Sequence, residues 1–203
     1  MWEQIYFQSF DGKRLENITE GRNWGVNILK LDQKGKAIYF TARREISTRN
    51  DFYKVDLKTK KITRLSTGPY NFTNVYLSPD NKHFIARYSN SETPTRVGLF
   101  TIGKKGTDVK VLYDLKGEKF DQYKIAKTKM LYMNVDGFTI PAEIILPIDM
   151  DSTKKYPVIV SIYGGPNSGT VMDTWRGVGE GTQWWANEGV IQVAMDHRAA
   201  GHC

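Results

Sequence analysis

The sequence predicts a mixed fold, in which the last part of a β-propeller is followed by the start of an α/β domain. Three observations predict it: a repeat with a period of 47 residues, a change of charge balance near residue 126, and a strand–helix–strand pattern close to the C-terminus. We expect residues 1–120 to form the propeller part and residues 121–203 to form the α/β part.

The repeat appears as short apolar runs that recur at a fixed step. Residues that begin or end such runs lie 47 positions apart in two sets: Ile5, Phe52 and Leu99, and Ile18, Leu65 and Leu112. A period of about 40 to 50 residues with alternating apolar positions and many Gly, Asp and Asn turns is typical of propeller blades. Helical repeats of similar length would show a different spacing of apolar residues.

Each period is expected to contain four short strands separated by turns. In the first period these are Val26–Leu31, Ala37–Ala42, Asp51–Leu57 and Lys61–Leu65. In the second they are Thr73–Leu77, His83–Tyr88, Val97–Ile102 and Val109–Tyr113. The residues before Val26 would supply the tail of a third blade. Because a closed propeller needs at least four blades, we expect this chain to be a piece of a larger protein, unless identical chains complete the propeller.

The charge is concentrated in the first part of the chain. The whole chain has 29 basic and 22 acidic residues and a net charge of +7. Residues 1–126 contain 23 of the basic residues and 14 of the acidic ones. The lysines cluster in turn-like stretches such as Lys58-Thr59-Lys60-Lys61, where they favour solubility and discourage edge-to-edge association of strands. Since no nucleic-acid-binding motif accompanies this charge, we expect no nucleic-acid partner.

The α/β part begins with a hairpin. The run Met130–Ile140 alternates around Asp136-Gly137, two residues that tolerate the positive φ of a tight turn, and its second strand continues to about Leu146. No apolar run reaches the roughly 20 residues that a membrane-spanning helix needs, so no membrane segment is expected. The single cysteine, Cys203, excludes an internal disulfide and a cysteine-based metal site, and no metal or cofactor is expected.

A βαβ unit follows the hairpin. Val158–Tyr163 is apolar enough to predict a buried parallel strand, Thr182–Glu188 is a helical segment ended by Gly189, and Val190–Met195 is a second buried strand. Ligands bind beyond the carboxyl ends of strands in such sheets. The run Tyr163-Gly164-Gly165-Pro166 lies at such an end and is therefore the candidate site.

These features together resemble the prolyl oligopeptidase clan of serine peptidases. The runs that carry the resemblance are Lys154–Pro166, which contains Tyr-Gly-Gly-Pro, then Trp184-Trp185-Ala186, and finally Met195-Asp196-His197-Arg198. They look most like the dipeptidyl peptidase IV group, whereas the acylaminoacyl peptidase branch carries His-Gly-Gly-Pro and prolyl oligopeptidase carries Tyr-Gly-Gly-Phe. The resemblance implies an α/β-hydrolase domain with a Ser/Asp/His triad, preceded by a propeller that restricts access.

The resemblance implies a function and a role for Tyr163. The parent protein would remove N-terminal dipeptides with proline or alanine as the second residue, through an acyl-enzyme. The tyrosine matching Tyr163 donates its hydroxyl to the oxyanion, and Gly164, Gly165 and Pro166 form the substrate loop. The alternative for Tyr163 is packing at a strand end with a satisfied hydroxyl. The partner would be a peptide substrate, the parent could form a homodimer, and the family is often periplasmic, secreted or membrane-anchored.

The sequence also departs from a complete peptidase. No Gly-x-Ser-x-Gly run is present, and Ser168 in Gly165-Pro166-Asn167-Ser168-Gly169 is expected to be an ordinary loop hydroxyl. His83, His197 and His202 do not take the position of a triad histidine. The family triad would lie beyond Cys203, so the chain by itself is expected to be inactive.

Two further interpretations concern loop residues. Asp196 and Arg198 match the family's Asp-x-Arg after the last strand, and we expect them to form a pair that fixes the loop rather than to take part in chemistry. Trp175, Trp184 and Trp185 are expected to pack in the core and loops. Two other functions remain open for the parent: an acylaminoacyl peptidase or oligopeptidase of the same clan, and a non-catalytic propeller protein that binds peptides or partners.

Overall fold

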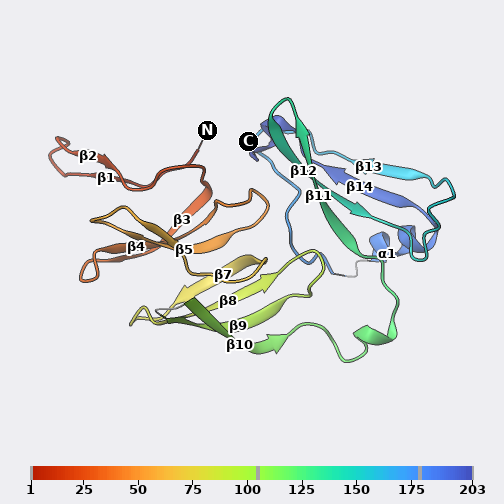
Figure 1. The fold of residues 1–203 in the computed structure, drawn as a ribbon, viewed down its shortest axis with the longest axis horizontal. Helices are drawn as coiled ribbons and strands as arrows, with labels where there is room; N and C mark the ends of the chain where they lie inside the picture. Colours follow the sequence, from red (N-terminus) through yellow and green to blue (C-terminus); the bar gives the residue numbers. More distant parts are fainter. Residues whose placement is uncertain (1, 104–105, 178–179, 203) are drawn as a thin grey trace. The chain divides into compact units, whose positions relative to one another are not determined.

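The computed structural model describes residues 2–103, 106–177 and 180–202 (Figure 1). The chain divides into two compact units. The first contains the chain up to Tyr88 together with Arg96–Tyr113, and the second contains Ser89–Thr95 together with the chain from Asp114 onward. The described part is mostly β-structure, with strands arranged in four sheets.

The first unit contains two four-stranded sheets and one two-stranded sheet. One has the order β3-β4-β5-β6, formed by Trp24–Asp32, Ala37–Arg43, Asp51–Asp56 and Ile62–Arg64. The other has the order β10-β9-β8-β7. Its strands are β7 (Asn71–Leu77), β8 (His83–Ser89), β9 (Arg96–Gly103) and β10 (Gly106–Asp114). The two-stranded sheet pairs β1 (Tyr6–Gln8) with β2 (Leu15–Asn17). All eight strands expected from the repeat are confirmed, with ends that differ by a few residues.

A hydrogen bond that recurs at the period of the repeat explains part of its sequence signature. The Thr19 hydroxyl oxygen accepts from the backbone N–H of Ile5 at 2.8 Å, and 47 residues later the Ser66 hydroxyl oxygen accepts from that of Phe52 at 3.1 Å. The Ser66 hydroxyl then donates to the buried carboxylate of Asp51 at 2.6 Å. Each hydroxyl therefore closes its strand pair at the position where ladder bonding ends.

The two four-stranded sheets of the first unit share a core of aromatic side chains. Phe52 from β5 and Phe72, Phe84 and Phe100 from the next sheet are almost completely buried. Phe84 stacks on Phe100 with ring centroids 4.5 Å apart, and its ring meets that of Phe52 edge to face at 4.9 Å. Alternating inward positions on strands of both sheets supply these rings, as the period-two pattern requires.

The second unit contains a sheet with the order β11-β12-β14-β13. In chain order, the strands are β11 (Thr128–Val135), β12 (Phe138–Ile145), β13 (Val158–Ser161) and β14 (Ile191–Met195). The helix α1 (Glu180–Asn187) connects β13 to β14. The hairpin turn is confirmed, since Asp136 and Gly137 have φ angles of 50° and 79°. Strands β13 and β14 pair in parallel, as predicted. Within the described ranges, no helix has the length and apolar character needed to cross a bilayer.

The predicted burial of β13 is wrong. Val158 and Val160 are 53% and 54% exposed, and Ile159 is 36% exposed, so both faces of the strand meet solvent. The strand lies at the edge of the four-stranded sheet, where it pairs with β14 on one side. Apolar composition predicted the strand correctly, but burial depends on neighbours that composition does not specify.

Candidate active site at the end of β13

Tyr163 follows β13 and begins the loop that leads to α1. Gly164 has a φ of +76°, which favours glycine, and turns the chain away from the strand. A Cβ atom on Gly165 would lie 2.4 Å from Cε1 of Tyr163, so the backbone at Gly165 passes directly against the tyrosine ring. The Tyr163 side chain is 70% exposed, and no described residue hydrogen-bonds its hydroxyl. Among the described residues the hydroxyl therefore has no protein partner, and it is open to solvent.

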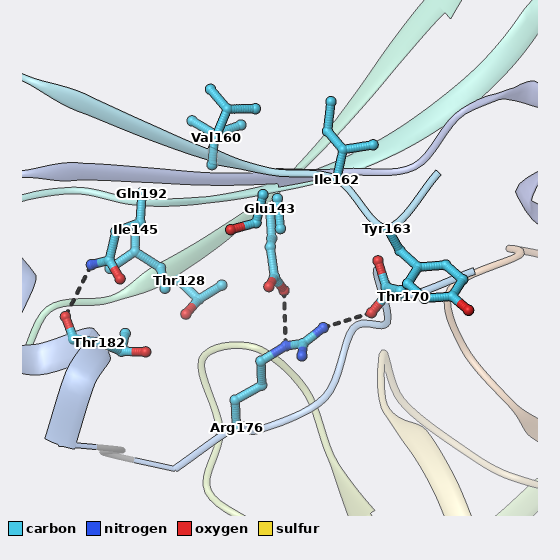
Figure 2. A pocket seen from close by; sticks show the side chains of 13 residues that line it. Thr128, Glu143, Ile145, Val160, Ile162, Tyr163, Thr170, Arg176, Thr182 and Gln192 are labelled. Carbon is cyan, nitrogen blue, oxygen red and sulfur yellow. Dashed lines mark hydrogen bonds and ion pairs between the residues drawn. The ribbon is translucent and has the colours of Figure 1, made fainter. Parts of the chain in front are cut away.

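Tyr163 lines one end of a pocket of about 630 Å³ on the sheet of the second unit. Figure 2 shows Arg176 bonded to both Glu143 and Thr170, and Tyr163 and Thr170 belong to the same lining. Val160 is also part of the lining. The pocket therefore combines apolar strand residues with one cation and one carboxylate.

Asp196 binds the loop that follows Tyr163. Its carboxylate is buried and lies directly after β14. It accepts hydrogen bonds from the backbone N–H of Thr170 at 2.9 Å, from the Thr170 hydroxyl at 2.9 Å and from the backbone N–H of Val171 at 2.8 Å. Nε2 of the buried His202 lies 2.8 Å from the same carboxylate, and because an ionised carboxylate only accepts, the histidine donates.

These contacts set the charge state of Asp196. Burial acts to raise the pKa of Asp196, but the hydrogen bonds from the backbone of Val171 and Thr170, from the Thr170 hydroxyl and from His202 outweigh burial, so the pKa lies below its usual value of 3.8. Asp196 is therefore an anion at neutral pH, and its bonds to the loop are charge-assisted.

The lowered pKa predicts a loss of stability in acid. A carboxyl group whose pKa is lower in the folded state than in the unfolded state stabilises the fold at a pH above its unfolded pKa. This stabilisation is lost as the pH falls below about 3.8 and then through the pKa of the folded state. We expect Asp196→Asn to flatten this acid limb of the unfolding free energy below about pH 3.8. Urea unfolding of both proteins at a series of pH values measures the effect, and an unchanged acid limb in the variant would contradict it.

Arg176 makes a second connection across the same loop. Its Nε donates to Glu143 at 3.1 Å, and its Nη2 donates to the backbone oxygen of Thr170 at 2.7 Å (Figure 2). Burial raises the pKa of Glu143, and the neighbouring Arg176 partly opposes this rise. The pair connects β12 to the loop at the same residue, Thr170, that Asp196 binds from β14.

Two further contacts hold the ends of the loop. The backbone N–H of Asn167 donates to the oxygen of Ala199 at 2.7 Å. The buried carboxylate of Asp173 accepts from the backbone N–H of Ser91 at 2.8 Å, within the second unit. The loop after Tyr163 is thus attached at several points to neighbouring strands and loops.

The expected pair of Asp196 and Arg198 is replaced by a different arrangement. Nη1 of Arg198 lies 3.4 Å from Asp136 at the hairpin turn, and its guanidinium lies over the ring of Phe138 at 5.5 Å. Asp196 instead uses both oxygens on Thr170, Val171 and His202, as described above. The two side chains therefore fix different loops. Asp196 is buried, whereas the side chain of Arg198 is more than half exposed.

The remaining candidates have structural contacts. The Ser168 hydroxyl donates to the oxygen of Pro166 at 3.1 Å, in agreement with a loop role. Nδ1 of His197 accepts from the backbone N–H of Ala199 at 3.1 Å. Trp175 packs against Phe120 at 5.8 Å, as expected. The packing expected of the other two tryptophans is only partial: Trp184 and Trp185 contact each other but are 54% and 39% exposed.

Sequence reasoning missed the contributions of Thr170, Glu143, Arg176 and His202. The short distance in sequence between Asp196 and His202 was the available signal for their contact. The sequence does not show the direction of the turn between them, which decides whether the two side chains meet. Within the described ranges, no cluster of three or more His, Cys, Asp or Glu side chains is arranged to hold a metal ion. Cys203 lies outside the described residues.

Comparisons with known proteins agree with this fold. Residues 2–95 match the family described as the dipeptidyl peptidase IV (DPP IV) N-terminal region. A dipeptidyl peptidase 4 of Trichophyton rubrum is 30% identical over 178 residues, which is 86% of this chain and 23% of that protein. A probable dipeptidyl-aminopeptidase B of Arthroderma benhamiae is 25% identical over 201 residues, which is 97% of this chain and 22% of that protein.

Two solved structures are similar as well. The crystal structure of dipeptidyl peptidase 4 from Porphyromonas gingivalis matches with a TM-score of 0.79 and 25% identity, over 96% of this chain and 27% of that one. A putative dipeptidyl aminopeptidase IV from Bacteroides ovatus matches with a TM-score of 0.75 and 25% identity, over 98% of this chain and 30% of that one.

These matches confirm the resemblance to the prolyl oligopeptidase clan. Within that clan, the chain is dipeptidyl peptidase IV-like. It spans about a quarter of the length of the relatives that it matches.

Proposed function

We propose that this chain is part of a serine peptidase of the dipeptidyl peptidase IV type, which releases N-terminal dipeptides with proline or alanine in second position. The two four-stranded sheets would be propeller blades, with residues 1–120 as the propeller part. Residues 121–203 would begin the α/β-hydrolase domain. The parent would act through an acyl-enzyme formed by a Ser/Asp/His triad that this chain does not supply.

The observation that carries the proposal is the hydroxyl of Tyr163, which has no hydrogen-bond partner in the part of the chain that the structure describes. Its side chain is exposed and lines the pocket, just beyond the carboxyl end of β13 and directly before Gly164-Gly165. The loop after this strand is where α/β-hydrolases place one arm of the oxyanion hole. When a nucleophile attacks a peptide carbonyl, negative charge develops on the oxygen, and a hydroxyl already in place stabilises that charge.

The surroundings of Tyr163 suit this task. Its hydroxyl has no bond to another described residue that would have to break before it donates to the substrate oxygen, and Gly165 leaves room for the ring without a side chain of its own. The contacts at Thr170 hold the loop before substrate arrives, so little reorganisation is needed when charge develops. Tyr163 stabilises a transition state but supplies neither nucleophile nor base.

Hydrolysis of glycyl-prolyl-p-nitroanilide by the protein encoded by the complete gene tests the proposal, beside an analogue with a blocked N-terminus. Cleavage of the free amine alone is the expected result. Cleavage of the blocked analogue would move the protein to the acylaminoacyl or oligopeptidase branches. No cleavage of either would favour the non-catalytic binding protein. A fluorophosphonate probe should leave the 203-residue chain itself unlabelled, and stoichiometric labelling of a serine would contradict its proposed inactivity.

Gly165→Ala should displace the Tyr163 ring and lower kcat by about 10²-fold at most, because the added Cβ would lie 2.4 Å from the ring. Steady-state hydrolysis of the proline substrate measures this. The matched control is Gly117→Ala, since a Cβ at Gly117 would meet nothing within 4 Å. Equal activities of the two variants would show that the ring position does not matter.

A further inference from the structure

The carboxylate of Asp196 accepts several hydrogen bonds from the loop that follows Tyr163. It makes no hydrogen bond to Tyr163 itself among the described residues. We propose that Asp196, held by His202, is a positioning residue that keeps Tyr163 in place for catalysis. This inference rests on the proposed function of Tyr163 and goes further, because it assigns the placement of the tyrosine to a carboxylate on a different strand.

The first step is the fixed position of Thr170. Asp196 receives two donors from that residue, the backbone N–H and the hydroxyl, and a third from the backbone N–H of Val171. The carboxylate is buried with 5% of its residue surface exposed, so water does not easily replace these donors. Because Asp196 directly follows β14, the loop is held relative to the sheet itself.

The second step is the role of His202. Its side chain is buried and donates to the same carboxylate oxygen that accepts from Val171. A Cβ on Gly169 would lie 2.5 Å from Nε2 of His202, so the loop backbone passes directly over the imidazole. His202 therefore satisfies Asp196 and also supports the loop one residue before Thr170.

The third step leads from this anchor back to the tyrosine. Asn167 is bonded to Ala199, in the same segment that carries Asp196 and His202. Only Gly164, Gly165 and Pro166 separate that bond from Tyr163, and the backbone of Gly165 contacts the ring. With the loop anchored at residues 167, 170 and 171, Gly165 limits the positions open to the ring.

The consequence concerns kcat rather than substrate binding. An oxyanion donor contributes when charge develops in the transition state, so a displaced hydroxyl lowers kcat while KM changes little. If Asp196 acts through Tyr163, removing the tyrosine hydroxyl should matter much less once Asp196 is altered. Such non-additivity is the signature of two residues that act on one interaction.

The test uses the protein encoded by the complete gene in four forms: unaltered, Asp196→Asn, Tyr163→Phe and the double variant. Asp196→Asn should lower kcat for glycyl-prolyl-p-nitroanilide by about 10-fold or more, and the effect of Tyr163→Phe should shrink by a similar factor in that background. Should Asp196→Asn fail to fold, Thr170→Val takes its place, since it removes a single hydroxyl from the network.

Asp151→Asn is the matched control. The carboxylate of Asp151 also accepts from the backbone N–H and the hydroxyl of a threonine, Thr153, at 3.0 and 2.7 Å, but in the loop that precedes β13. This variant should leave kcat unchanged. An effect equal to that of Asp196→Asn would show general destabilisation and would overturn the inference.

Hydrogen exchange of the peptide covering residues 163–171 supplies a readout that does not depend on activity. Asp196→Asn should speed exchange of these amides at least 10-fold, and Asp151→Asn should not. Strictly additive effects on kcat, or unchanged exchange, would overturn the positioning role. If Tyr163→Phe leaves the kcat of the otherwise unaltered protein intact, the proposed oxyanion role is wrong, and exchange alone then decides whether Asp196 holds the loop.

Discussion

Tyr163→Phe is expected to lower kcat for glycyl-prolyl-p-nitroanilide by about 10² to 10³-fold, which corresponds to about 2.7–4 kcal/mol of transition-state stabilisation. The substitution removes one hydroxyl from an exposed side chain that has no hydrogen-bond partner among the described residues. No protein contact is lost with it, so the fold should be unaffected. KM should change little, because a ground-state carbonyl gains less from the donor than an oxyanion does.

Steady-state kinetics of the protein encoded by the complete gene measures this effect, with thermal unfolding as a check of the fold. The matched control is Tyr123→Phe, because Tyr123 is 68% exposed in the same unit and does not line the pocket. The control should keep full activity. A Tyr163→Phe protein with normal kcat would show that the tyrosine hydroxyl does not contact the reacting oxygen.

The strands were predictable because their signals are local. Alternating apolar residues and turn residues with tolerance for positive φ lie next to each other in the sequence, as at Asp136-Gly137. The repeat added independent support, since apolar residues such as Ile5, Phe52 and Leu99 recur every 47 positions. The parallel pairing of β13 with β14 followed from the intervening helix.

Burial and side-chain partners were less predictable because they depend on distant segments. The exposure of β13 is set by its place at the sheet edge, which its own apolar composition does not reveal. Arg198 bonds Asp136, a residue 62 positions away, because the hairpin turn lies beside the loop after β14. A two-residue spacing to Asp196 suggested a nearer partner, but that carboxylate is occupied by donors from Thr170 and Val171.

The candidate site was predictable in part for the same reason. Tyr163 and its glycines form a continuous motif at a strand end, where general rules for parallel sheets place ligands. The residues that hold this motif come from β12, from the loop before α1 and from the loop after β14. Glu143, Arg176 and His202 have no common motif, and the fold alone brings them to the same loop.

Phe84→Ala is expected to lower the free energy of unfolding of the two four-stranded sheets by about 3–5 kcal/mol. Phe84 is 1% exposed, and its ring contacts Phe100 in its own sheet and Phe52 in the next. Removing it takes apolar surface from both sheets and leaves a cavity between them. Neighbouring rings fill such a cavity poorly, because they are already packed against one another.

Native-state hydrogen exchange of amides in β8 and β9 measures this free energy within a larger protein. The matched control is Ile85→Ala, one residue along the same strand on the opposite face, where the side chain is 41% exposed. Its cost should stay below about 1.5 kcal/mol, since a partly exposed side chain loses less on truncation. Equal costs at both positions would mean that the two sheets do not depend on the shared aromatic core, and that each is stabilised mainly by its own strand pairing.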